Sequence, residues 1–149
     1  MGILGRVYFA SVAAAACVLL CACTATSPAR NSGDPTSRKN AALEAIIDAQ
    51  LAAYNRRDVE EFLSHYSDDA KLFDYPNQST ESGKDQLRAR YTRSFANKDI
   101  RAVIVDRIVF DRFVIDHERI TGRPDGTSEA VAVYELKDGK IVAVTFLKP

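Results

Sequence analysis

The spacing of the hydrophobic residues changes once along this chain, close to residue 100. Before that point, apolar side chains recur every three or four residues, which predicts helices over residues 40–55 and 84–95. Asp58 and Glu61 form a capping-box pattern that opens a shorter helix between those two. After residue 100, apolar and polar residues alternate, which predicts strands at 100–110, 113–121, 128–136 and 141–147. This order predicts an α+β domain whose helices pack on one face of a curved antiparallel sheet.

The connections agree with this order. A short strand is expected at residues 70–74, and a polar loop at 75–83 follows it. The position of Asp111-Arg112 between two expected strands predicts a hairpin turn there, and the Gly-containing stretches 122–126 and 137–140 are turn signals. The 149 residues suffice for one domain with a core of its own, which we place at residues 40–149.

The N-terminus has the composition of a targeting segment. Arg6 precedes an uncharged apolar run at residues 7–20, and no acidic residue occurs before Asp34. As a helix this run is about 21 Å long, short of the roughly 30 Å hydrocarbon core, so it fits a secretory signal better than a membrane span. The sequence Leu20-Cys21-Ala22-Cys23 resembles a bacterial lipobox. That resemblance implies removal of residues 1–22 and lipidation of Cys23 by a diacylglycerol and an amide-linked acyl chain such as palmitate.

Residues 23–39 are rich in Ser, Thr, Pro and Gly and predict a flexible tether. Thr24 stands where an Asp would retain many lipoproteins in the inner membrane, so we expect anchoring in the cell envelope, at the periplasmic side of the outer membrane if the cell is Gram-negative. Ordinary secretion after cleavage behind Ala25 is the alternative, and it predicts a soluble protein. All three cysteines lie in or beside this segment, so the domain has no disulfide and no cysteine metal site.

Four segments carry a family resemblance. Residues 54–58, 66–70, 116–122 and 133–141 are similar to SnoaL-like proteins of the nuclear transport factor 2-like (NTF2-like) superfamily, over about residues 41–147. The resemblance implies a cone of helices and curved sheet around an apolar pocket, and a homodimer formed through the sheet. Members include isomerases, cyclases, hydrolases and binding modules, so function must be argued from the pocket residues.

The same resemblance places Asp74 at the position of the general base of steroid isomerases. Those enzymes also need a tyrosine and a protonated acid as an oxyanion hole. Here Gln50 stands at the tyrosine position, and the only carboxylate near the acid position, Glu129, is out of register. A steroid isomerase with that mechanism is therefore not expected.

Two polar residues stand out among apolar ones. Gln50 lies within the apolar stripe of the first helix, where a buried amide needs a hydrogen-bonding partner; that partner is either a protein group or water, or a ligand carbonyl. His117 is a candidate base, but strand alternation places it with Phe113 and Ile115, opposite Asp116 and Glu118, without showing which face is inward. Three tyrosines are candidates for lining the pocket or for plain core: Tyr54, Tyr91 and Tyr134.

We therefore expect a membrane-anchored domain whose pocket binds a small apolar or amphipathic molecule. One alternative is a cofactor-free acid–base enzyme, of isomerase, cyclase or hydratase type, with Asp74 as base and Gln50 or His117 as its partner. A second alternative is a non-catalytic module that docks an envelope protein. The chain has no metal-ligand spacing and no phosphate-binding loop, so no metal or cofactor is expected. Its 20 basic and 20 acidic residues give no reason to expect a nucleic-acid partner.

Overall fold

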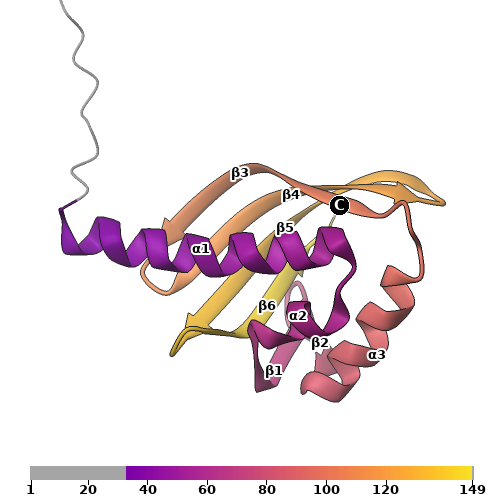
Figure 1. Ribbon diagram of the computed structural model, residues 1–149, viewed down its shortest axis with the longest axis horizontal. Helices are drawn as coiled ribbons and strands as arrows, with labels where there is room; N and C mark the ends of the chain where they lie inside the picture. Colours follow the sequence, from indigo (N-terminus) through magenta and orange to yellow (C-terminus); the bar gives the residue numbers. More distant parts are fainter. Residues whose placement is uncertain (1–32, 149) are drawn as a thin grey trace, which may run out of the picture.

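Three helices cover one face of a curved six-stranded sheet in the computed structural model, which describes residues 33–148 (Figure 1). The elements follow in the order α1 (Pro35–Arg56), α2 (Val59–Ser64), β1 (Tyr66–Asp74), β2 (Gln78–Ser82), α3 (Lys84–Phe95), β3 (Arg101–Phe110), β4 (Phe113–Arg123), β5 (Gly126–Lys137) and β6 (Lys140–Leu147). The predicted α+β class is confirmed. The predicted signal segment and Cys23 lie outside the described residues.

The sheet is mixed, which corrects the expectation of a purely antiparallel one. Its strand order is β2-β1-β6-β5-β4-β3, and every neighbouring pair is antiparallel except β1 and β6, which run parallel. A parallel pair needs a long crossover, and the chain between residues 74 and 140 supplies one. The last strand of the β3 to β6 meander, β6, thus pairs with β1, the strand that follows α1 and α2.

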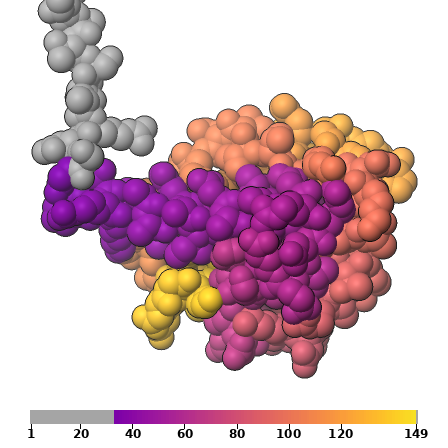
Figure 2. Space-filling model, in the orientation of Figure 1, coloured from indigo at the N-terminus to yellow at the C-terminus, as the bar shows by residue number. Residues whose placement is uncertain are grey.

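The first helix begins five residues earlier than predicted. The side chain of Asp34 accepts a hydrogen bond from the backbone N–H of Ser37 at 3.3 Å, and Pro35 occupies the first turn. A capping aspartate followed by proline is a strong helix start, because proline lacks only an N–H that would have no helical partner there. Residues 35–39 therefore belong to α1 and not to the tether. These first turns of α1 extend beyond the rest of the domain in Figure 2.

Two further elements differ from the prediction. β1 begins at Tyr66, four residues before the strand expected at 70–74, and the expected loop at 75–83 contains β2. β2 is a short polar strand at the edge of the sheet, so it has no hydrophobic alternation by which to predict it. The helix at 84–95 and the four later strands lie within three residues of where the spacing predicts them.

An aromatic cluster fills the space between the helices and the sheet. Neighbouring rings stand 4.2 to 6.4 Å apart between centroids, many of them tilted or edge to face; they are Tyr54, Phe62, Tyr66, Tyr91 and Phe95. At the far edge, the Asn55 side chain exchanges two hydrogen bonds of 2.8 Å with the backbone of Ala102. That contact ties the end of α1 to β3 and keeps the helix over the sheet.

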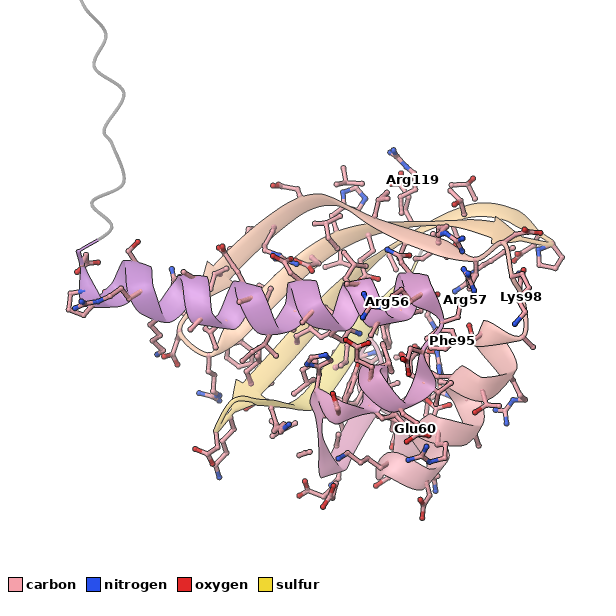
Figure 3. The ribbon with its side chains drawn as sticks, viewed as in Figure 1. Arg56, Arg57, Glu60, Phe95, Lys98 and Arg119 are labelled. Carbon is pink, nitrogen blue, oxygen red and sulfur yellow. The ribbon has the colours of Figure 1, made fainter. Side chains whose placement is uncertain are left out.

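The structure decides which face of β4 is inward. Val114, Asp116, Glu118 and Ile120 are buried against the helices, whereas His117 and Arg119 lie on the other face. In Figure 3 the Arg119 side chain stands on the side of the sheet away from α1. No helix within residues 33–148 is long and apolar enough to cross a membrane.

Candidate functional site

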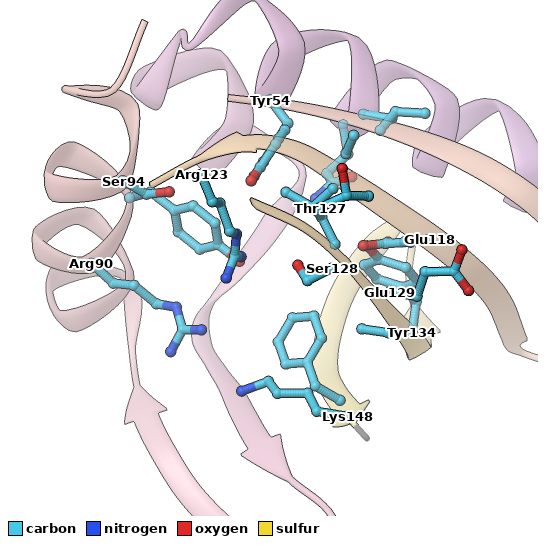
Figure 4. A pocket seen from close by; sticks show the side chains of 17 residues that line it. Tyr54, Arg90, Ser94, Glu118, Arg123, Thr127, Ser128, Glu129, Tyr134 and Lys148 are labelled. Carbon is cyan, nitrogen blue, oxygen red and sulfur yellow. The ribbon is translucent and has the colours of Figure 1, made fainter. Parts of the chain in front are cut away.

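A cavity of about 630 Å³ lies between α1, α3 and the inner face of the sheet (Figure 4). This volume is within the range of small-molecule sites. Its walls include all four side chains that the sequence singles out as ligand-contacting candidates, namely Gln50, Tyr54, Tyr91 and Tyr134. The apolar part of the lining consists of Leu51, Ala102, Ile120, Ala130 and Phe146.

The strongest chemical feature of the cavity is a buried carboxyl group on β4. Glu118 is 8% exposed, and the Tyr134 hydroxyl donates a 2.6 Å hydrogen bond to its Oε1 atom. Burial raises the pKa of Glu118 to about 7, although the hydrogen bond from Tyr134 opposes this rise. A carboxyl group with such a pKa exchanges protons near neutral pH, so it can serve as either acid or base.

The neighbouring carboxylate on the same face is used differently. Asp116 is fully buried and accepts hydrogen bonds from Arg107 Nε at 2.6 Å and Nη2 at 2.8 Å. Arg107 also donates from Nη1 to Asp48 of α1 at 2.7 Å, and these bonds raise the pKa of the guanidinium. Asp116 is therefore neutralised by an ion pair that links α1 to the sheet. Glu118 has only the Tyr134 hydroxyl as its hydrogen-bonding partner within the described residues, which leaves it available to a ligand.

The Gln50 amide has a partner within the protein and also takes part in the cavity wall. It is 4% exposed, and its Nε2 donates to the hydroxyl of Tyr66 at 3.0 Å, so the buried amide has a protein partner. It also lines the cavity. Burial raises the pKa values of Tyr66 and Tyr134 well above the ordinary value, so both remain protonated hydrogen-bond donors at neutral pH.

Asp74 does not line the cavity. Both of its carboxylate oxygens accept hydrogen bonds from Lys148 Nζ, at 2.7 and 2.9 Å. Its place at the end of β1 brings it beside the residue that follows β6, the parallel neighbour of β1. The expected contact of Asp74 with Gln50 or His117 is absent among the described residues, which corrects that prediction.

His117 lies on the outer face of the sheet, opposite the cavity. Its Nε2 is 2.9 Å from Oε2 of Glu129, whose other oxygen accepts a hydrogen bond from Arg119. His117 faces outward because successive side chains of a strand point to opposite faces, and its neighbour Glu118 faces inward. The sequence missed Glu118 as a site residue. Its signal was a carboxylate on the same strand face as Val114 and Ile120.

Comparison with known proteins identifies the family. The sequence model of the SnoaL-like domain matches residues 47–144. The chain belongs to the SnoaL-like domain family. The sequence has no significant match among curated proteins.

Solved structures have the same fold as this SnoaL-like domain. An uncharacterised cystatin-fold protein from Novosphingobium aromaticivorans is 30% identical, with a TM-score of 0.66 over 72% of this chain and 97% of that one. An NTF2-like protein of unknown function from Cytophaga hutchinsonii is 14% identical, with a TM-score of 0.60 over 72% and 89%. A candidate ketosteroid isomerase from Kribbella flavida is 16% identical, with a TM-score of 0.64 over 74% and 80%. The predicted NTF2-like fold is confirmed.

Within residues 33–148 of this SnoaL-like domain, no cluster of three or more His, Asp or Glu side chains is arranged to hold a metal ion. The chemistry that the described side chains offer in the cavity is proton exchange at Glu118 and hydrogen bonding from tyrosine hydroxyls.

Proposed function

We propose that the cavity binds a small amphipathic molecule, with its polar end or reacting group beside Glu118 and Tyr134. The observation that carries the proposal is a carboxyl group that is buried in the wall of a cavity and forms no ion pair with a cation of residues 33–148. Burying such a group costs free energy, so its presence without a charge partner favours a role in binding or chemistry over one in stability. The apolar wall suits the body of the ligand.

Binding is tested by thermal-shift screening of the full chain against lipid and metabolite extracts of the host cell. Ala130 faces the cavity, and Ala130→Phe fills part of it. The matched control is Ala45→Phe, because Ala45 is exposed on α1 and does not line the cavity. We expect an extract fraction to raise the Tm of the wild type and of Ala45→Phe but not of Ala130→Phe. Equal shifts in all three would contradict binding in the cavity.

The second candidate is acid–base catalysis with Glu118 in the role first assigned to Asp74. A pKa of about 7 suits a group that takes a proton from a carbon beside a carbonyl and returns it to another carbon of the same molecule. Tyr134 would hold the carboxyl in place. The test incubates the protein in D₂O with the molecule that the extract screen recovers, and follows deuterium uptake into that molecule. Glu118→Gln should abolish uptake, and Asp74→Asn should not; uptake that depends on Asp74 would contradict this assignment.

We propose further that Cys23 carries the lipid anchor and that the domain lies at the cell envelope. The lipobox-like sequence supports the anchor, and the Ser/Thr-rich character of residues 24–34 suits a spacer between lipid and α1. A domain held at a membrane surface is well placed to collect amphipathic molecules from it.

The outer face of the sheet supports a homodimer. Four large apolar side chains of β3 are exposed, namely Val103, Val105, Ile108 and Phe110. Exposed apolar residues gathered on one strand are typical of an interaction surface. Sedimentation should give a dimer for the full chain and a monomer for Ile108→Lys. A monomeric wild type would favour the alternative of a module that docks another envelope protein.

A further inference from the structure

We propose that the cavity is built for an organic acid, whose carboxylate pairs with Arg123 while its apolar body crosses the cavity and brings a second polar or reacting group beside Glu118 and Tyr134. This inference deepens the proposed binding function and rests on it. Three cationic side chains line the cavity and come from separate parts of the fold: Arg90 from α3, Arg123 from the end of β4 and Lys148 from the residue that follows β6. In Figure 4 their charged ends lie on one side of the cavity, and Glu118 with Tyr134 lies on the other.

Of these three cavity residues of the described chain, Arg123 alone has no carboxylate partner and can offer its positive charge to a ligand. Arg90 donates to both carboxylate oxygens of Glu81, at 2.7 and 3.0 Å, and Lys148 is paired with Asp74. Arg123 forms no ion pair within residues 33–148, and the side chain that its guanidinium contacts is the Tyr54 hydroxyl. One unpaired guanidinium matches the single charge of a carboxylate better than the higher charge of a phosphate monoester.

An irregularity in β4 turns Arg123 toward the cavity. Ile120 pairs with Ser128 on β5, but Arg123 pairs with Gly126, so β4 contains one extra residue between these two pairs. Ile120 faces inward, and strict alternation would then place residue 123 on the outer face. The bulge reverses this alternation, and re-aiming a side chain at a site is a known use of bulges.

Contacts of Gly122 with Asp99 and Asn97 hold the bulge in place. Gly122 has φ of +78°, and a Cβ atom added there would lie 2.1 Å from the backbone oxygen of Asp99. The Asn97 side chain donates a 2.7 Å hydrogen bond to the carbonyl of Gly122. Only glycine fits this position, so the direction of Arg123 is set by the backbone and not by its own flexible side chain.

The remaining lining completes an amphipathic site. In Figure 4 Ser128 lies between the cationic ends and Glu118, where its hydroxyl can donate to a bound molecule. The Ser94 side chain, which also lines the cavity, is hydrogen-bonded to Tyr54. Leu51, Ile120 and Phe146 provide the apolar wall. Glu129 also belongs to the lining, but its carboxylate is engaged by His117 and Arg119 and does not oppose an anion there.

The test titrates the purified full chain at pH 7 with octanoate, octanol and octyl phosphate, followed by NMR. We expect the wild type to bind octanoate about tenfold more tightly than octanol, as one charge-assisted hydrogen-bonded pair would give. Arg123→Gln should remove that preference and leave octanol binding unchanged, which also shows that the variant is folded. The control is Arg93→Gln, since Arg93 is an exposed residue of α3 that does not line the cavity; it should behave as the wild type.

Each other outcome contradicts a defined part of the account. Equal affinity for octanoate and octanol, unchanged in Arg123→Gln, would overturn the organic-acid assignment and leave the binding function standing. Tighter, Arg123-dependent binding of octyl phosphate would overturn the choice of a carboxylate. If neither octanoate nor octanol binds the wild type, the proposed function fails together with this inference.

Discussion

Glu118 and Asp116 lie two residues apart on the same face of β4, yet their carboxyl groups have opposite surroundings. Asp116 is held by Arg107, and Glu118 receives only the Tyr134 hydroxyl among the described residues. The strand period puts both in the interior, but which of them meets a cation depends on residues distant in the sequence. This difference makes Asp116 part of the scaffold and Glu118 the candidate functional group.

The raised pKa of Glu118 predicts a pH dependence of stability. Because its folded-state pKa is about 7 and its ordinary value is 4.5, the folded chain binds this proton more tightly than the unfolded chain. The contribution of Glu118 is complete below about pH 4.5 and is lost as pH rises through 7. At about 1.4 kcal/mol per pKa unit, the loss is on the order of 3 kcal/mol.

This dependence is measured by urea unfolding of the wild type and of Glu118→Gln between pH 4.5 and 8. The two proteins differ only at residue 118, so the difference between their slopes reports on the Glu118 carboxyl group. The free energy of unfolding of Glu118→Gln should fall less with rising pH. Parallel curves would show that Glu118 titrates normally and is not a buried acid.

The ion pair of Asp116 predicts a large loss of stability. Asp116→Asn leaves Arg107 without its buried partner and should cost about 3–5 kcal/mol in unfolding free energy. Asp48→Asn removes the other partner of Arg107, but the Asp48 side chain is 63% exposed, so the expected cost is below about 1 kcal/mol. Similar losses from both substitutions would contradict the view that the buried half of this network carries its stabilising effect.

At the scale of elements, the bulge at Gly122 is the feature with the clearest structural consequence. Gly122→Ala adds a methyl group against the backbone of Asp99 and should destabilise the domain by more than about 2 kcal/mol. The matched control is Gly139→Ala, since Gly139 has φ of +74° but no atom within 4 Å of the added Cβ. It should cost only about 1 kcal/mol for the left-handed backbone. Equal unfolding free energies in chemical denaturation would show that the close contact with Asp99 is relieved at no cost.

The elements also show what the sequence can and cannot predict. The helix at 84–95 and the strands after residue 100 follow from side-chain period alone, because each buries one regular apolar face. β2 has no such face, and the start of α1 is set by the cap at Asp34, not by hydrophobic spacing. The bulge that aims Arg123 depends on the approach of Asp99, which is distant in the chain, so strand alternation gives the wrong face for this residue.

At the scale of the whole molecule, the cavity lies between the helices and the curved sheet, in the place that the family resemblance implies. Gln50, Tyr54, Tyr91 and Tyr134 line it as expected, since each lies on an apolar face that must turn inward. The expectation for Asp74 came from a matching position in other enzymes, and in this chain Lys148 pairs with that carboxylate. Charge partners across the sheet are set by tertiary contacts that no local pattern records.

The anchor is a prediction about the whole molecule in its cell. Cys23→Ser should release a soluble protein or leave an unprocessed precursor. It should leave the fold intact, because residues 33–148 contain no cysteine. Cys21→Ser should have almost no effect. Membrane fractionation and the intact mass of the native protein are the measurements, and a mature chain that begins at Thr26 without lipid would contradict the anchor.

The most direct test of the central claim is a crystal structure of the full chain loaded with the molecule recovered from the extract screen. The account predicts electron density for that molecule in the cavity, with a polar atom within hydrogen-bonding distance of Glu118 or Tyr134. An empty cavity, with the molecule bound instead on the outer face of the sheet, would contradict it.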